Sequence, residues 1–239
     1  MLPLMTSRPS RARRFLSIAV VACSLASPGV FAEWRGGIEG GTVVRDGGNA
    51  TRLGLRLAND ERPLTHSLYA DWLNYERGNG YRVGYLPRYW FDEALYLFGE
   101  AEGRVDRPLA IDRGLLLLGG VGYRVFDSAV AGLGIELGGG ARSTRFEPSV
   151  GAAEGVEESE GLGLARVSAF RELADLVRLE LDAETLQGAR LGELRAEAAL
   201  AYRVAGGAVR LGYRVRRLSF EEADTLTDEE TSVTFAYGF

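Results

Sequence analysis

The stretch VRLGYRVR at residues 209–216 decides the fold class, because every second residue is apolar and the residues between are arginine or glycine. Successive side chains of a β-strand point to opposite faces, so this stretch predicts a strand with one apolar and one charged face. Residues 177–184 (VRLELDAE) and 194–204 (LRAEAALAYRV) repeat the pattern. Strands of about ten residues with one apolar face are typical of barrels that cross a membrane.

The same alternation divides the rest of the chain into strand-length segments. We expect twelve strands, at residues 34–44, 49–59, 65–76, 79–91, 94–104, 112–126, 129–146, 161–170, 177–186, 193–204, 208–219 and 230–239. An even number suits a bacterial single-chain barrel, and ten strands is the alternative count. The sequence therefore predicts an all-β fold, a single antiparallel transmembrane β-barrel over residues 33–239. Around residues 66–76 and 162–170 both faces carry mixed residues, so the outward face is not assigned there.

Composition excludes other fold classes. Glycine accounts for 32 of the 239 residues, about 13% against a usual level of roughly 7%. Because glycine in a helix interior costs roughly 1 kcal/mol relative to alanine, a helical bundle is not expected. The mean hydropathy is −0.06, and no apolar run reaches the roughly 18 residues that a membrane-spanning helix needs. A membrane protein of several helices is therefore excluded.

Residues 1–32 have the pattern of an export signal. Four arginines at positions 8–14 precede an apolar run at residues 15–26, and residues 30–32 (VFA) form a cleavage site before Glu33. We expect this signal peptide to be removed. The alternative is lipidation of Cys23, because residues 20–23 (VVAC) also resemble a lipobox.

Removal of residues 1–32 leaves 24 of the 28 basic residues against 33 acidic ones, a net charge of about −9, and no cysteine. Nucleic acid is not expected to bind so acidic a chain. Disulfides, cysteine-based metal sites and thiol chemistry are excluded for the mature chain.

Connections and aromatic residues agree with a first strand that rises from the periplasm. Residues 105–111, 147–160 and 220–229 are expected as long outer loops, and residues 92–93, 127–128 and 205–207 as short periplasmic turns. An aromatic belt at the periplasmic interface is then expected from Trp34, Tyr89, Phe91, Tyr123, Tyr202, Tyr237 and Phe239.

The chain ends with an apolar residue at every second position: Val233, Phe235, Tyr237 and Phe239. This ending resembles the C-terminal signature of bacterial outer-membrane barrels. The resemblance implies recognition by the barrel assembly machinery.

Charged residues on the inward faces are the candidate functional residues: Arg52, Arg56, Arg82, Arg88, Arg178, Glu180, Asp182, Glu184, Arg195, Arg203, Arg210, Arg214 and Arg216. Either the lumen is wide enough for water and its arginines favour small anions, or arginine and acidic side chains fill and close it. The sequence does not decide between these alternatives.

No catalytic, cofactor-binding or metal-binding residues are assigned. The carboxylates of Glu180, Asp182 and Glu184 share one strand face and could hold a hard cation, but neighbouring arginines favour ion pairs across strands. The single histidine, His66, precedes Ser67, and adjacent residues point to opposite faces of a strand, so the two cannot form a catalytic pair.

The expected outer loops at residues 147–160 and 220–229 are acidic. A solvated surface is the plain interpretation. The alternatives are binding of divalent cations among lipopolysaccharide head groups and a response to ionic strength through charge repulsion. The expected partners are outer-membrane lipids and lipopolysaccharide, and we expect a monomer.

Short motifs resemble the family of salt-induced outer membrane proteins (domain of unknown function 481). They are Trp34, Gly48-Asn49, Tyr89-Trp90-Phe91, Asp112-Arg113, residues 119–123 (GGVGY) and residues 135–138 (IELG). The chain departs from the family at Ala50, where threonine is usual. The resemblance implies an outer-membrane barrel and a link to salt, and it supplies no catalytic residues.

We therefore expect a non-enzymatic barrel of the bacterial outer membrane, a small-solute pore or a structural envelope protein linked to osmotic adaptation. A lipid-modifying outer-membrane enzyme and a soluble periplasmic β-barrel that binds a ligand are the alternatives.

Overall fold

The computed structural model describes residues 34–45, 48–75, 78–146, 157–221 and 224–238. The expected signal peptide and Phe239 lie outside these residues. The described chain forms twelve strands and one short 3₁₀ turn, η1 (Arg107–Leu109). The strands are β1 (Trp34–Arg45), β2 (Gly48–Asn59), β3 (Leu64–Tyr75), β4 (Gly78–Trp90), β5 (Leu95–Asp106), β6 (Ile111–Asp127), β7 (Ala131–Phe146), β8 (Glu157–Ala174), β9 (Val177–Gly188), β10 (Leu191–Val204), β11 (Gly207–Phe220) and β12 (Leu226–Gly238).

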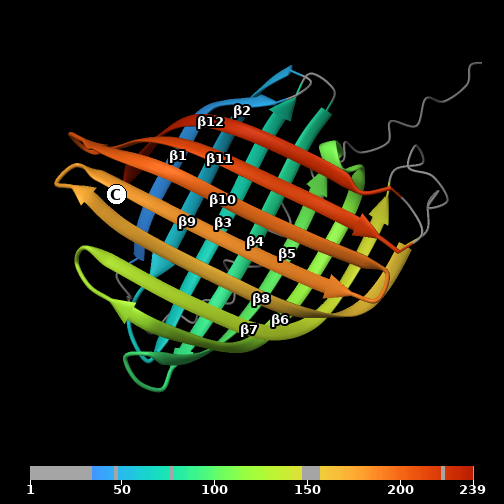
Figure 1. The fold of residues 1–239 in the computed structure, drawn as a ribbon, viewed down its shortest axis with the longest axis horizontal. Coiled ribbons are helices and arrows are strands. Elements are labelled where there is room, and N and C mark those ends of the chain that lie inside the picture. Colours follow the sequence, from blue (N-terminus) through green and yellow to red (C-terminus); the bar gives the residue numbers. More distant parts are fainter. Residues whose placement is uncertain (1–33, 46–47, 76–77, 147–156, 222–223, 239) are drawn as a thin grey trace, which may run out of the picture. The chain divides into compact units, whose positions relative to one another are not determined.

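Each strand pairs antiparallel with its neighbours in sequence, and β1 pairs with β12 to close the barrel (Figure 1). The prediction of a twelve-stranded antiparallel barrel is confirmed. Closure satisfies every strand edge, which a sheet in lipid requires. We call the end that carries connections 60–63, 91–94, 128–130, 175–176 and 205–206 the turn end. The opposite end, which carries η1, is the loop end.

Two strands begin four residues before their expected bounds. β8 begins at Glu157 rather than at residue 161, and β12 begins at Leu226 rather than at residue 230. Acidic residues near the start of both strands are typical of loops. In the structure these residues pair with arginines of the adjacent strand: Glu160 lies opposite Arg142 and Asp228 opposite Arg216. The connections at residues 46–47, 76–77 and 189–190 of the loop end are as short as turns, so the expected contrast in length holds only in part.

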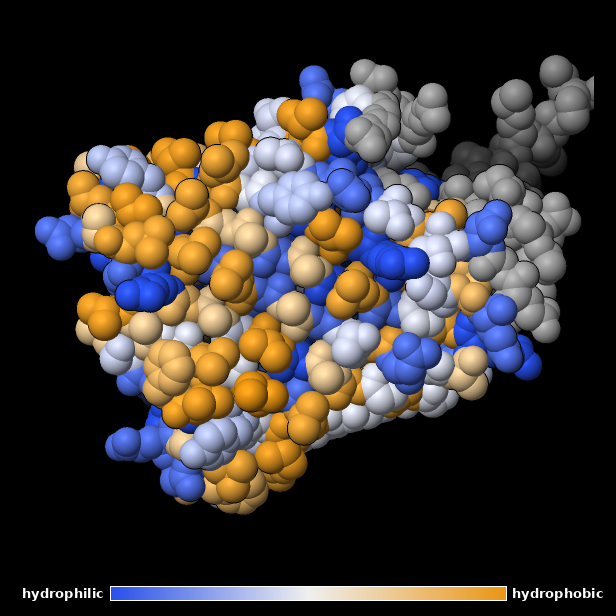
Figure 2. Space-filling model, viewed as in Figure 1, coloured by the Kyte–Doolittle hydropathy of each residue, from blue (hydrophilic) through white to orange (hydrophobic). Residues whose placement is uncertain are grey.

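Apolar side chains cover the outer face. Leu115 and Leu117 of β6 and Leu211 of β11 are about half exposed, as expected of side chains that face lipid. On the face seen in Figure 2, apolar residues are dense toward the turn end. The expected aromatic belt lies there and is exposed, formed by Trp34, Tyr89, Phe91, Tyr123, Tyr202 and Tyr237. No helix among the described residues is both long and apolar enough to cross a membrane.

Apolar side chains inside the barrel explain the two segments whose outward face the sequence left undecided. In β8, Leu162 and Leu164 are buried while Val167 is exposed. In β3, Asp71 and Leu73 are the buried pair. The interior holds an apolar cluster of Trp90, Tyr96, Phe98, Leu116, Leu118, Leu162, Leu164 and Leu186. Both faces of β8 are therefore partly apolar, which hides the alternation.

Glycine permits close approaches in the wall. A Cβ at Gly140 of β7 would lie 1.9 Å from the carbonyl oxygen of Leu117, so these two strands approach more closely than any other residue allows. A Cβ at Gly84 of β4 would lie 2.2 Å from the ring of Tyr69, which covers this glycine from β3. Gly84 therefore makes room for an inward tyrosine.

Candidate functional site in the barrel interior

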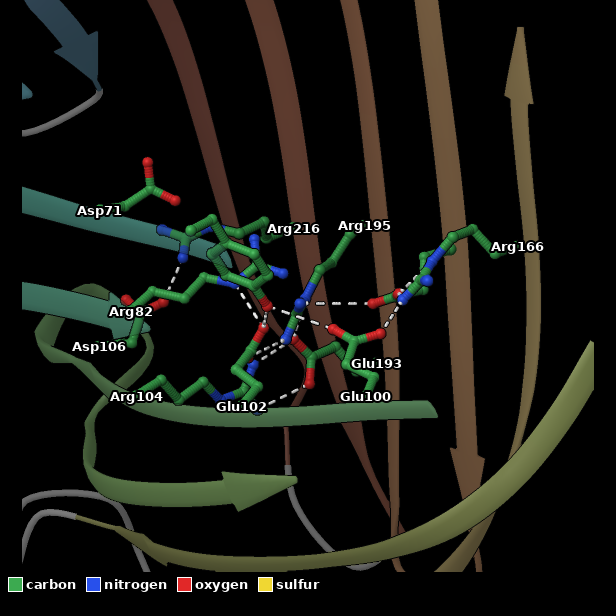
Figure 3. A network of polar contacts seen from close by, with 12 residues as sticks. Asp71, Arg82, Glu100, Glu102, Arg104, Asp106, Arg166, Glu193, Arg195 and Arg216 are labelled. Carbon is green, nitrogen blue, oxygen red and sulfur yellow. Dashed lines mark hydrogen bonds and ion pairs between the residues drawn. The ribbon is translucent and has the colours of Figure 1, made fainter. Parts of the chain in front are cut away.

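Ion pairs cross the interior between β5 and the opposite wall. Arg104 donates to both carboxylate oxygens of Glu193 on β10, at 2.6 and 2.7 Å. Arg195 of β10 donates to Glu102 of β5 at 3.3 Å, and Arg216 of β11 pairs with Asp106 of β5. Because β5 lies five strands from β10 and six from β11 in a ring of twelve, these pairs bridge the lumen rather than neighbouring strands (Figure 3).

Glu102 lies at the centre of this network. Its side chain is fully buried and accepts hydrogen bonds from Arg82 of β4 at 2.5 Å and from the hydroxyl of Tyr69 at 2.6 Å. A buried carboxylate is stable only when its charge is balanced and its oxygens are hydrogen-bonded. Arg82, Arg195 and Tyr69 together meet that requirement.

A second group of ion pairs joins β4, β5, β7, β8 and β9. Arg166 donates to Glu100 at 2.6 Å and to Glu136 at 2.7 Å, and it also pairs with Glu184. Glu136 accepts further hydrogen bonds from Arg88 at 3.0 Å and from the hydroxyl of Tyr96 at 2.9 Å. One guanidinium thus holds three carboxylates from three strands.

Ion pairs between arginine and glutamate also join β9, β10, β11 and β12. Glu197 accepts from Arg210 at 2.5 Å and from Arg214 at 2.5 Å. Arg214 also reaches Glu230 of β12 at 2.9 Å, and Arg210 reaches Glu180 at 3.1 Å. Carboxylates therefore balance these inward arginines, which is one of the two arrangements that the sequence left open.

The structure places most of the predicted inward residues on one cavity of about 670 Å³: Arg52, Arg56, Arg82, Arg88, Glu180, Asp182, Glu184, Arg195, Arg210, Arg214 and Arg216. Arg178 lines a second cavity of about 700 Å³ toward the turn end. Arg203 lies at the turn end of β10, where it is half exposed and donates to Glu172 at 2.5 Å. The two cavities share seven lining residues: Ser67, Arg88, Tyr96, Gly134, Ser168, Glu180 and Asp182.

Asp182 differs from its neighbours. Glu180 pairs with Arg210, and Glu184 pairs with Arg166 and with Arg195 at 3.4 Å. In the described part of the chain, no arginine lies within ion-pair distance of Asp182, whose register partner on β10 is Glu197. No three histidine, cysteine or acidic side chains of the described residues are grouped so that they could hold a metal ion.

Sequence reasoning missed several residues of the network, among them Glu100, Glu102, Arg104, Asp106, Glu136, Arg166 and Glu193. For β5, the alternation of apolar and charged residues could have identified the inward residues. Leu95 and Leu97 are exposed on its outer face, so the alternate residues Glu100, Glu102, Arg104 and Asp106 point inward.

Apolar side chains pack together at the loop end of the interior. Leu109 of η1 packs with Ile111, Phe146, Leu191 and Leu218, and each of the five is at most 3% exposed. These residues come from β6, β7, β10, β11 and the β5–β6 connection. The turn therefore folds over the end of the lumen and contacts the opposite wall.

Residues outside the interior occupy simpler positions. His66 lies on the outer face, with its ring 6.3 Å from Trp34 and 6.0 Å from Tyr85, whereas Ser67 lines both cavities.

In the turn between β4 and β5, backbone N–H groups of Leu95 and Ala94, with a smaller effect of Arg62, hold the pKa of Asp92 below its ordinary value.

Three residues of the C-terminal pattern, Val233, Phe235 and Tyr237, are exposed on the outer face of β12. The fourth, Phe239, lies outside the described residues.

Comparisons with known proteins agree with the barrel. The NanC porin has a similar structure (TM-score 0.57, 9% identity, covering 84% of this chain and 98% of that one). So does the KdgM porin (TM-score 0.50, 11% identity, covering 85% and 99%). At these identities the likeness shows the fold alone. No curated protein matches the chain. A family model described as "Protein of unknown function, DUF481" matches residues 53–239. With more than half of its length matched, the chain belongs to the DUF481 family.

Proposed function

We propose that the protein is a narrow channel of the outer membrane for small polar solutes and that this structure is its closed form. The fold, shared with two porins, and the apolar outer face support a position in the membrane. Export by residues 1–32, assembly through the C-terminal strand, contact with lipopolysaccharide and a monomeric state belong to the same proposal.

The single observation that carries the proposal is the polar interior. Two cavities of about 670 and 700 Å³ meet at shared residues, and charged side chains line both. Charged groups in such number are stable in a barrel only where water or ion pairs replace bulk solvent. A barrel that served only as a structural element would need no such space.

Closure at the loop end explains why the interior is not an open tube. The cluster of Leu109, Ile111, Phe146, Leu191 and Leu218 places buried apolar side chains from four strands and η1 at that end. An apolar constriction closes a pore by excluding water. Conduction therefore requires η1 to move away from β10 and β11.

The test is conductance across a planar bilayer for the wild-type barrel and two variants. Leu109→Ser makes the closing cluster polar and is expected to raise the open probability. Leu164→Ser makes the matched change in another interior apolar cluster and is expected to leave the open probability unchanged. Silence of all three proteins at every salt concentration would overturn the channel and favour a structural barrel. Equal conductance of all three would retain the channel and reject η1 as its closure.

A further inference from the structure

Two guanidinium groups lie over one indole ring at the turn end of the interior. The guanidinium carbons of Arg62 and Arg124 lie 4.3 and 4.5 Å from the centre of the Trp90 ring. The ring is fixed in place, because its Nε1 donates to the hydroxyl of Thr65 at 3.2 Å and it packs on Tyr96 at 4.3 Å between centroids. This stack of Arg62, Trp90 and Arg124 therefore places both arginines against a ring whose position is fixed.

The charges of these arginines are unequally balanced. Arg124 donates to Asp127 at 2.6 Å, and the neighbouring Arg88 donates to Glu136 at 3.0 Å. Arg62 is exposed, and no carboxylate among residues 34–45, 48–75, 78–146, 157–221 and 224–238 lies within ion-pair distance of it. Its guanidinium carbon lies over the Trp90 ring. The N–H groups along the edge of the guanidinium remain available to a ligand.

The space next to this stack is a cavity of about 700 Å³. Arg62, Arg88 and Arg124 line it together with Thr65 and Ser67, whose hydroxyl groups can donate further hydrogen bonds. A guanidinium edge with nearby hydroxyl donors matches the geometry of a planar oxyanion such as a carboxylate. The site is formed by β3, β4, β6 and the connection between β2 and β3.

Carboxylates elsewhere in the lining of the cavity limit the charge of the ligand. Asp60, Asp127, Glu180 and Asp182 also line the cavity, together with a fourth arginine, Arg178. Asp182 has no arginine within ion-pair distance among the described residues. An anion with several charges would be repelled as it entered, whereas a small monoanion meets Arg62 first at the turn end.

We propose that the turn-end cavity binds a small monocarboxylate, held at the edge of Arg62 and assisted by Arg88, Thr65 and Ser67. The inference rests on the proposed function only in so far as it says which solutes the channel admits. The binding itself does not depend on conduction, so the two can fail separately.

The experiment follows the indole N–H signals of the detergent-solubilised barrel by nuclear magnetic resonance while acetate is added at constant ionic strength. The chain has three tryptophans, and Trp34 and Trp72 serve as internal controls because neither lines the cavity. A saturable shift is expected for Trp90 alone. Arg62→Gln should weaken acetate binding about tenfold or more, as loss of a charge-assisted pair does.

Arg203→Gln is the matched control, because Arg203 lies at the same end outside the cavity. It should retain the Trp90 response. Citrate should bind no more tightly than acetate. Retention of the full response in Arg62→Gln, an equal response to chloride, or tighter binding of citrate would overturn the site. A barrel that binds acetate but never conducts would overturn only the channel.

Discussion

Arg104 and Glu193 form a two-pronged ion pair that joins β5 to β10 across the barrel interior. Both side chains are almost completely buried. Glu193 also accepts a hydrogen bond from Arg195 at 2.7 Å. Arg142 lies 3.5 Å from the same carboxylate. Glu193 therefore lies between guanidiniums that would otherwise repel each other in a space with little water.

We expect Glu193→Gln to destabilise the barrel strongly. The change removes the carboxylate that pairs with the buried guanidinium of Arg104, a loss of about 3–5 kcal/mol in comparable cases. Urea unfolding in detergent, followed by heat-modifiable gel migration, measures it. The control is Arg203→Gln, which breaks the half-exposed pair with Glu172 and should cost no more than about 1 kcal/mol. Equal effects of the two substitutions would show that the pairs across the lumen do not stabilise the barrel.

Tyr69 and Gly84 lead to a prediction about packing. A methyl group at Gly84 would collide with the Tyr69 ring, so Gly84→Ala should destabilise the barrel by about 1–3 kcal/mol. Gly103 lies opposite Val83 on the adjacent strand, and a Cβ there would meet nothing within 4 Å. Gly103→Ala should stay within about 0.5 kcal/mol of wild type.

A second measurement separates collision from a general intolerance of alanine in β4. In a Tyr69→Ala background the ring is absent, so the additional cost of Gly84→Ala should disappear. A cost that persists there would mean that the Tyr69 ring is not what excludes a side chain at Gly84.

The strand pattern was predictable because the outer face of each strand must be apolar. This requirement holds along β11, where exposed Leu211 alternates with inward Arg210. The alternation predicts which face each residue occupies. It does not predict which strand lies opposite across the lumen. The pairing of Arg104 with Glu193 could not be predicted for that reason. Leu162 and Leu164 were ambiguous because the interior also has an apolar side, which the alternation of a lipid-facing strand does not anticipate.

Closure of the loop end could not be predicted from the sequence either. Leu109 follows two residues that read as part of a polar loop, and its burial depends on Leu191 and Leu218 from the far wall. Only the closed ring of strands brings these residues together. The Arg62–Trp90–Arg124 stack has the same origin, since its three members come from different connections and strands.

Asp182 should respond to substitution in the opposite direction to Glu180. Its register partner is Glu197 and its neighbour on the same face is Glu180. Like charges in such positions are destabilising, so Asp182→Asn should stabilise the barrel by about 0.2–1 kcal/mol. Glu180→Gln removes a partner of Arg210 and should destabilise it slightly. Stabilisation by both substitutions, or loss of a metal-dependent property in either, would contradict the ion-pair interpretation of this strand.

Asp92 provides a pH-dependent prediction outside the membrane-spanning strands. Backbone N–H groups of Leu95 and Ala94 lower its pKa, with a smaller effect of Arg62. Because the folded pKa is depressed, the contribution of Asp92 to stability is complete above the ordinary carboxyl pKa and is lost as pH falls through the lowered value. Carbon resonances of the carboxyl group should titrate below the ordinary range, and Arg62→Gln should raise the midpoint. An unchanged midpoint in that variant would show that the charge of Arg62 does not reach the turn.

Closure of the loop end predicts one-sided access to the interior. Ser168 lines both cavities, and the only cysteine of the chain is Cys23. In a Cys23→Ser background, we expect a membrane-impermeant thiol reagent added to intact cells not to label Ser168→Cys. Permeabilised cells, which admit the reagent from the turn end, should show labelling. Adding Leu109→Ser should allow labelling from outside, because the apolar cluster no longer excludes water.

Ser219→Cys is the control for orientation, since Ser219 lies beside the loop end of β11. It should be labelled in intact cells whether or not Leu109 is changed. Labelling of Ser168→Cys from outside in the otherwise unchanged barrel would mean that the cluster around Leu109 does not close the lumen. Failure to label Ser219→Cys would instead reverse the proposed orientation, because the loop end would then face the periplasm.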